Sequence, residues 1–200
     1  MRLKHTLDYI PQLYMAPKRQ IVRQADANVH ALDLSSPIEV EGDVASRFSK
    51  VKFPLVQLEE VTFEVSDDEI SFLCSESYAN FVASIEEQVA TTIAEKSVAW
   101  FGKSITCDQC EKMLRSSLDG HKNPKHTVSC EKLRVFDHLQ NPCELTSSGC
   151  SVPLLRIEGV LFYEKHCELL WSAVQMKLSE DLPLPNDDDD DDDPSEWVGN

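Results

Sequence analysis

Residues 152–178 read VPLLRIEGVLFYEKHCELLWSAVQMKL, two apolar runs on either side of the polar triplet Glu164-Lys165-His166. In places both alternating faces of each run are apolar, which is typical of strands that are covered on two sides. Gly159 falls within the first run, where a glycine favours a bulge or a bend. The pattern predicts a long β-hairpin, and a buried helix is the alternative for its second arm.

Upstream of the hairpin, residues 50–74 alternate apolar and polar side chains in three stretches, with turn chemistry at Ser66-Asp67-Asp68. Three strands are therefore predicted, and Pro54 makes the first an edge strand or a bulged one. Residues 77–98 then change to a helical period, with Ser75 or Ser77 as the cap and with these residues facing inward: Phe81, Val82, Ile85, Val89, Thr92 and Ile93.

A shorter helix is predicted over Thr106–Leu118, with Met113, Leu114 and Leu118 inward, then a loop over Asp119–Pro124 and a strand over Val128–Val135. This order of elements predicts a mainly β protein with helical insertions (α+β). It is the pattern of a small OB-fold-like β-barrel with helices between strands three and four. The expected organisation is an N-terminal arm over residues 1–36, the barrel domain over 37–178 and an acidic tail over 179–200.

The tail contains no base, and its charge excludes a packed structure. We expect it to be disordered, with Trp197 as an apolar tip that docks on a basic surface; a tail that only keeps the protein soluble is the alternative. Its acidic run consists of Asp187, Asp188, Asp189, Asp190, Asp191, Asp192 and Asp193.

The 200 residues hold 19 lysines and arginines against 35 acids, a formal net charge of −16. This balance excludes a simple basic nucleic-acid coat and disfavours a membrane-surface protein. No apolar run reaches the about 18 residues of a membrane span, and residues 1–20 lack the apolar core of a secretory signal. Seven cysteines in no regular framework indicate reduced thiols in an intracellular protein.

Two kinds of chemistry find weak support. A CxxC pair followed by two further cysteines could be a zinc knuckle, but the spacing is irregular and the pair lies in a helical pattern, so we expect thiols and no metal. These candidates are Cys107, Cys110, Cys130 and Cys143. Motifs for nucleophilic, metalloprotease or phosphate-loop chemistry are absent from the sequence, so we expect no enzyme and no cofactor.

Residues 96–134 reverse the charge of the chain, with eight bases against four acids, and begin next to aromatic side chains. Bases of a single strand stack on aromatic rings while Lys and Arg follow its phosphates, so this mixture favours single-stranded nucleic acid; core packing is the alternative for the aromatics. The candidate binding residues are Trp100, Phe101, Lys103, Lys112, Arg115, Lys122, Lys125, Lys132, Arg134, Phe162 and Trp171.

Four lines of sequence, SVAWFGKSI (97–105), CEKMLRSSL (110–118), KLRVFD (132–137) and the hairpin, resemble a protein family of nucleocytoplasmic large DNA viruses. More distantly, the chain is similar to podovirus-type single-stranded DNA-binding proteins. Two motifs carry the resemblance, and their matching residues are Trp100, Phe101, Gly102 and Lys103 in the first and Ile157, Gly159, Phe162 and Trp171 in the second. The resemblance implies an OB-fold core and an acidic C-terminal tail that ends in an aromatic residue. This sequence departs from that pattern, because Trp197 stands three residues before its last residue.

We therefore expect a non-enzymatic single-stranded DNA-binding protein of a large DNA virus, located in the host cytoplasm or nucleus. Its acidic tail would compete with DNA for the binding groove and recruit viral replication proteins. No membrane partner is expected, and a homodimer is one candidate assembly. The alternative is a virion or core structural protein whose barrel contacts other proteins and not DNA.

Overall fold

The computed structural model describes residues 20–40, 46–120 and 123–180. The expected acidic tail and most of the expected N-terminal arm lie outside these residues. The helices are α1 (Glu76–Phe101) and α2 (Cys107–Met113), and two short 3₁₀ turns span Gln24–Asp26 and Val29–Ala31. None of the described helices is long and apolar enough to cross a membrane.

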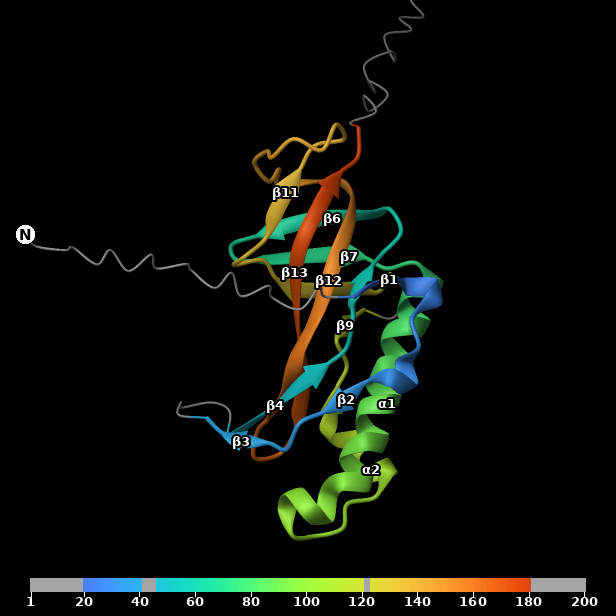
Figure 1. Cartoon of the computed structure of the whole chain (residues 1–200), viewed down its shortest axis with the longest axis vertical. Helices are drawn as coiled ribbons and strands as arrows, with labels where there is room; N and C mark the ends of the chain where they lie inside the picture. Colours follow the sequence, from blue (N-terminus) through green and yellow to red (C-terminus); the bar gives the residue numbers. More distant parts are fainter. Residues whose placement is uncertain (1–19, 41–45, 121–122, 181–200) are drawn as a thin grey trace, which may run out of the picture.

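Thirteen strands make up the rest of the described fold (Figure 1). They are β1 (Ile21–Arg23), β2 (Asp33–Leu34), β3 (Ile38–Glu39), β4 (Arg47–Lys52), β5 (Leu55–Gln57), β6 (Val61–Ser66), β7 (Glu69–Leu73), β8 (Leu114–Arg115), β9 (Leu118–Asp119), β10 (Lys125–Ser129), β11 (Arg134–Phe136), β12 (Ser148–Phe162) and β13 (Cys167–Leu178).

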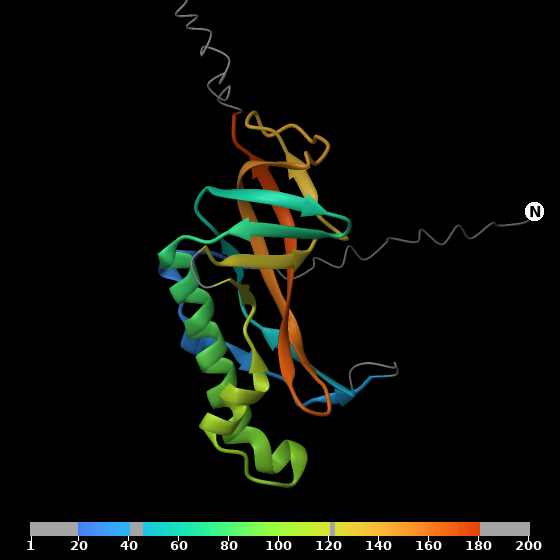
Figure 2. The same cartoon turned by 180° about the vertical axis from the view of Figure 1, so that it is seen from behind.

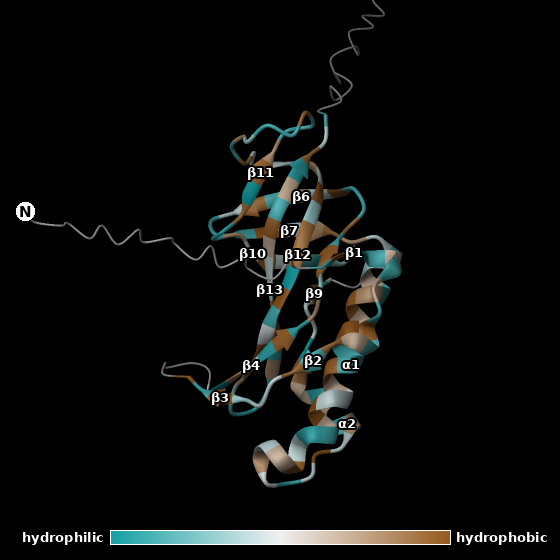
Figure 3. Ribbon diagram, viewed as in Figure 1, coloured by the Kyte–Doolittle hydropathy of each residue, from teal (hydrophilic) through white to brown (hydrophobic). Residues whose placement is uncertain are grey.

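The predicted hairpin is confirmed, because both of its arms are strands. β12 and β13 pair antiparallel from Ser151↔Leu178 to Phe162↔Cys167. Buried and more exposed residues alternate along most of both strands, and Figure 3 shows hydrophilic and hydrophobic residues along the two arms. The register shifts between Ile157 and Gly159, which confirms the bulge predicted at the glycine.

The barrel closes where the first residues of β12 pair with β6. From there the ladder runs β6, β7, β10 and β13, and the β12–β13 pairing completes a closed five-stranded OB-like barrel, so the predicted fold class is confirmed. β10 and β13 are parallel, and the other neighbours in the ring are antiparallel. The prediction that the helices lie between barrel strands three and four is wrong, because they lie between the second and the third. The first predicted strand corresponds to β4 and β5, which pair with β12 beyond the ring and do not count as barrel strands.

Beyond the barrel, β12 and β13 continue as a ribbon, and β5, β4 and the short β3 are added at one edge. The strand predicted over residues 51–55 is two strands, because Pro54 has no N–H and interrupts the ladder after β4. Residues 20–36 of the expected arm lie against this sheet: β1 pairs with β5, β2 pairs with β4, and Leu32 and Leu34 are buried.

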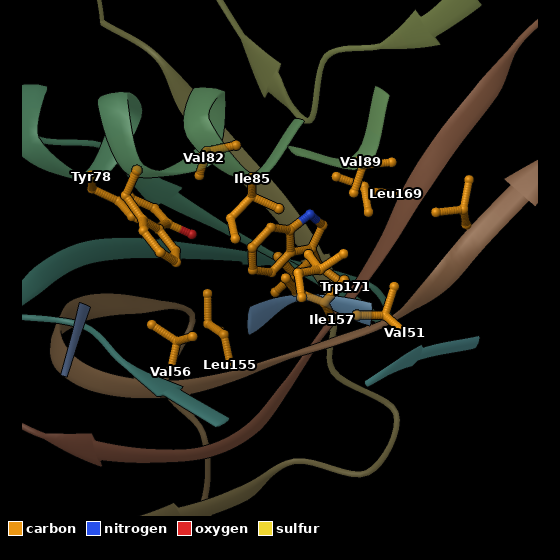
Figure 4. Packing of buried hydrophobic residues seen from close by; sticks show 14 of the residues in the cluster. Val51, Val56, Tyr78, Val82, Ile85, Val89, Leu155, Ile157, Leu169 and Trp171 are labelled. Atoms are coloured by element: carbon orange, nitrogen blue, oxygen red, sulfur yellow. The ribbon is translucent and has the colours of Figure 1, made fainter. Parts of the chain in front are cut away.

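α1 covers one face of the ribbon, as both views show (Figures 1 and 2). Ser75 accepts a hydrogen bond from the Tyr78 amide at its start, and Gly102, at a φ of 69°, ends it. All six residues predicted to face inward are buried. Figure 4 shows the resulting core, in which Val82, Ile85 and Val89 pack toward side chains of β12 and β13.

The second helix is shorter than predicted. α2 begins after Thr106, which forms a capping box with Gln109, and ends at Met113. Leu114 lies in β8, which pairs with β13, and Leu118 lies in β9, which pairs with β10. The predicted strand over Val128–Val135 is likewise two strands, β10 and β11, with a turn between them. In both places tertiary pairing determines the local structure.

Gly159 allows two strands to approach closely. A Cβ atom at this position would lie 2.1 Å from Cε2 of Phe48 and 2.6 Å from the carbonyl oxygen of Ser49. Since the backbone oxygen cannot swing away as a side chain can, a Gly159→Ala substitution must separate β12 from β4. We expect it to lower the free energy of unfolding by about 1–3 kcal/mol, measured by urea denaturation.

The matched control is Gly102→Ala. That residue has a φ of 69° and nothing within 4 Å of a new Cβ, so only backbone strain of about 1 kcal/mol is expected. A Gly159→Ala variant as stable as the wild type would contradict the close packing of β4 on β12.

Candidate nucleic-acid interface

The sheet face that points away from α1, here called the outer face, carries a row of five facing residues. The register of four neighbouring strand pairs places these residues side by side: Arg23 in β1, Gln57 in β5, Leu154 in β12, Gln175 in β13 and Arg134 in β11. All five are exposed or half-buried. Because adjacent strands lie about 4.8 Å apart, the two arginines stand about 19 Å apart across the sheet. The row is a track of polar and apolar groups between two bases.

Other bases lie on the same face. Residues that face each other on paired strands point to the same side of the sheet, and side chains alternate between the two sides along each strand. The residues of the outer face can therefore be identified from the strand registers and from the exposure of alternate residues. The bases of the outer face are Arg23, Lys50, Lys52, Arg115, Arg134, Arg156 and Lys177. Two acids, Glu158 and Glu168, share the β12–β13 part of it.

A polar cluster lies at the centre of the outer face. The Arg156 Nη1 donates to Glu158 Oε1 at 3.1 Å, and the Ser172 hydroxyl donates to the same oxygen at 2.6 Å. The Arg156 side chain is 27% exposed, and its buried Nε has no hydrogen-bond partner among the described residues. The Glu158 carboxylate therefore holds the guanidinium, and the part of the guanidinium that is open to solvent keeps donor capacity for an anion.

The opposite side of the barrel has the reverse charge. Acidic side chains gather on β6, β7 and the turns beside them: Glu64, Asp67, Asp68, Glu69 and Glu131. Lys125 of β10 is nearby, but its Nζ lies 2.7 Å from Glu64 Oε2. OB-fold proteins commonly bind oligonucleotides on their second and third barrel strands. In this chain those strands are β7 and β10, and this acidic side would repel phosphates.

The first sequence motif lies at a cavity on the face that α1 covers. Phe101 and Lys103 line this cavity of about 540 Å³, together with Arg47 from β4 and Phe162 from β12. Arg47 stands 5.8 Å from the centre of the Phe101 ring. Trp100 is half-buried, 5.5 Å from Lys96 Nζ. Lys103 and Lys112 also share a second, smaller hollow beside α2. The motif therefore joins the helix end to the sheet and places Lys103 at the mouth of the cavity.

Two of the predicted stacking residues are core residues instead. Trp171 is 3% exposed, and its Nε1 donates to the Ser117 hydroxyl at 3.2 Å. Phe162 is 7% exposed and packs edge-on against Phe101, with ring centres 5.6 Å apart. A ring without a free face cannot stack on a nucleobase, so neither residue is available to bind DNA in this way. Each points inward on its strand, which the apolar pattern alone does not distinguish from an exposed aromatic.

The remaining predicted residues are spread over the molecule. Arg115 and Arg134 lie on the outer face, whereas Lys125 and Lys132 lie beside the acidic strands. Lys122 and the tail residues from Asp187 to Asp193 and Trp197 lie outside the described residues. The structure thus places only part of the predicted set at two surfaces, the cavity and the outer face. It adds basic residues that sequence reasoning missed: Arg23, Lys50, Lys52, Arg156 and Lys177.

The four candidate zinc ligands do not form a cluster in the described part of the chain. Cys107 begins α2, Cys110 is the buried residue of the same helix, and Cys130 and Cys143 flank β11. Burial raises the pKa values of the Cys110 and Cys130 thiols, which favours the neutral thiol over a metal-binding thiolate. No group of three or more potential metal ligands occurs within residues 20–40, 46–120 and 123–180. That the protein holds no zinc stays a prediction.

No family model and no curated protein sequence matches the chain. Among solved structures, a C-terminally truncated single-stranded DNA-binding protein from bacteriophage Enc34 is similar at a TM-score of 0.46 and 8% identity, over 72% of this chain and 95% of the phage chain. The same phage protein in complex with single-stranded DNA gives a TM-score of 0.41 and 7% identity, over 74% and 97%. Similarity at this level does not assign a function to this chain.

A buried polar cluster lies between α1 and the barrel. His126 of β10 is completely buried, its Nδ1 is hydrogen-bonded to the Tyr78 hydroxyl, and its ring stands edge-on to Trp171 at 4.9 Å. Its Nε2 has no partner among the described residues. Burial lowers the pKa of His126 to about 3, because the charged imidazolium is poorly solvated there. The cluster lies below the surface, out of reach of a bound nucleic acid.

This burial makes stability depend on pH. The folded-state pKa of His126 is about 3, below the ordinary value of 6.5. Between pH 3 and pH 6.5 the histidine therefore binds a proton in the unfolded chain but not in the folded protein. Its contribution to the free energy of unfolding is complete above pH 6.5 and decreases as the pH falls toward 3. We expect its NMR ring signals to stay those of a neutral imidazole from pH 8 to pH 5; a titration in that range would contradict the burial.

Proposed function

We propose that this protein binds single-stranded DNA without enzymatic activity and that the strand lies on the outer face. One observation carries the proposal: the row from Arg23 to Arg134, which places a base at each side of an accessible sheet face. A chain of net charge −16 gains little general attraction for phosphates, so only such a local gathering of bases can bind them. The OB-like barrel supplies the rigid frame.

The outer face suits a single strand better than a duplex. Between its arginines and lysines it carries half-buried apolar side chains, among them Leu154 and Leu161. These side chains can contact unstacked nucleobases. Duplex readers commonly insert a helix or a β-ribbon into a groove. In the described residues, α1 is instead packed against the sheet on the opposite face, and the β12–β13 ribbon is widened at one edge by β4. Phosphates would follow the arginines and lysines while the bases face the sheet.

The position of the C-terminal segment supports competition by the acidic tail. β13 ends at Leu178, and Lys177 faces Phe136 of β11, two residues from Arg134. The chain therefore leaves the sheet beside one side of the basic row. Ten acids follow from Glu180 onward. A tethered anion reaches an effective concentration on the order of millimolar, so we propose that Asp187–Asp193 imitate phosphates on the outer face when DNA is absent.

The wider role follows from the same site. We propose that the protein coats single strands during replication or recombination of a large DNA virus, and that DNA binding displaces the tail and frees it to recruit replication proteins. A virion or core structural role is the alternative. The two roles differ in their response to salt, because DNA binding through phosphates weakens steeply as salt rises.

The first test removes charge from the row. Arg23→Ala and Arg134→Ala should each weaken binding of an oligothymidylate and lower the slope of log affinity against log salt by about 0.7, the loss of one phosphate contact. Fluorescence anisotropy over a range of salt concentrations measures both quantities. Lys125→Ala is the matched control, since this lysine is paired with Glu64 on the acidic side.

The sequence-based candidates at the cavity form a second arm of the same experiment. If Lys103→Ala and Lys112→Ala lower the slope while the two arginine variants do not, the strand follows the cavity and the outer-face assignment is wrong. If the wild-type protein shows no salt-dependent binding of single strands, the proposed function itself is wrong.

The tail is tested by truncation after Leu178. Removing the acidic segment eliminates the competing anion and also reduces the negative charge that opposes the approach of DNA, so both effects tighten binding. The gain should be largest at low salt, where screening is weakest. Equal affinity of the truncated and full-length proteins at low salt would show that the tail only keeps the protein soluble.

A further inference from the structure

Phe48 of β4 lies across the one outer-face position of β12 that has no side chain. The β-bulge after Ile157 places Gly159 opposite Leu170, an exposed residue, and next to Lys50 of β4. A Cβ on Gly159 would meet Phe48 Cε2 at 2.1 Å and Cζ at 2.3 Å. The ring edge therefore occupies the space of the missing side chain, and the ring is held against the strand backbone.

The surroundings of this ring are apolar side chains, one acid and several basic residues. The registers place Ile38, Phe48, Leu161, Glu168 and Arg115 in one row of facing residues. Ile38 is 63% exposed, and Phe48 and Leu161 are half-buried. Within the described residues Phe48 makes no aromatic pair or cation–π contact, unlike Trp100, Phe101 and Phe162. The ring thus combines a fixed orientation with a partly free surface.

We propose that Phe48 is a base-stacking residue of the outer face, with Lys50 as the partner of the adjoining phosphate. This inference rests on the proposed function and adds to it the place where a base is bound. Nucleobases offer a π-face whatever their sequence, and an aromatic ring beside a lysine is the combination that binds an unpaired nucleotide. Lys50 is exposed and faces Gly159 across the ladder, so the charge and the ring are adjacent.

The ring and the arginine row mark the two ends of one track. Leu154 of the row and Leu161 beside Phe48 are seven residues apart on β12, or about 23 Å along the strand. A single strand of several nucleotides can therefore contact both, in keeping with the about 4–16 nucleotides that an OB domain covers. Charge contacts dominate at the row and stacking at Phe48, so substitutions at the two ends should have different signatures.

The test compares Phe48→Leu with the wild type by anisotropy on oligothymidylate. Leucine keeps an apolar side chain against the strand but removes the π-face, so we expect about tenfold weaker binding with an unchanged salt slope. Phe48→Tyr should restore most of the affinity. Leu73→Ala is the matched control, because Leu73 is an exposed apolar residue on the acidic side of the barrel. Thermal denaturation of each variant separates loss of binding from loss of folding.

A second variant gives a direct signal. In Phe48→Trp, the added indole fluorescence should be quenched by oligothymidylate, measured as the difference from the wild type. Unchanged affinity in a folded Phe48→Leu variant, or no additional quenching in Phe48→Trp, would overturn the assignment while the proposed function stands. A wild type that does not bind single strands would overturn both. If Phe48→Leu instead dissociates a dimer and leaves DNA affinity unchanged, the patch is an interface between copies of the chain.

Discussion

The continuous pairing of β12 with β13 is the interaction on which the rest of the structure depends. β12 is 15 residues long, and one of its edges is paired with β13 while the other is divided among β6, β5 and β4. The first part of this edge closes the barrel, and the remainder carries the ribbon that α1 covers. The bulge at Gly159 lets β4 approach the second part. One hairpin thus builds both the frame and the outer face, and damage to it would affect folding and binding together.

The arrangement also separates charge. Acids gather around β6, β7 and their turns, whereas the bases of β1, β4, β11, β12 and β13 share the outer face. In a strongly acidic protein this separation favours the outer face, as proposed, for a phosphate chain and disfavours the barrel strands that OB folds commonly use. The Arg156–Glu158 pair at the centre of the outer face holds its guanidinium in place, so binding does not have to order a free side chain first.

The sequence predicts the hairpin, the long helix and the barrel because each has a strong local period. It does not predict the outer face, because that surface depends on which strands become neighbours. Arg23 joins the row of Arg134 only because β1 pairs with β5. Both strands are three residues long, and no local sequence pattern specifies that they pair. Phe162 and Trp171 are stacking candidates in the sequence because aromatics on strands alternate in the same way whether they point in or out. Both faces of the hairpin carry apolar residues, so the sequence does not show which face is buried. The ends of α2 and β10 differ from prediction where short pairings override propensity.

Chemical-shift mapping of the isotope-labelled full-length protein with oligothymidylate tests the central claim most directly, because it locates the strand without substitution. The account predicts shifts of amide signals along the outer face, at Phe48, Lys50, Arg134 and their neighbours on β12 and β13. It also predicts little change on β6 and β7. Shifts confined to the cavity around Phe101, shifts confined to the acidic barrel strands, or no shifts at all would contradict it.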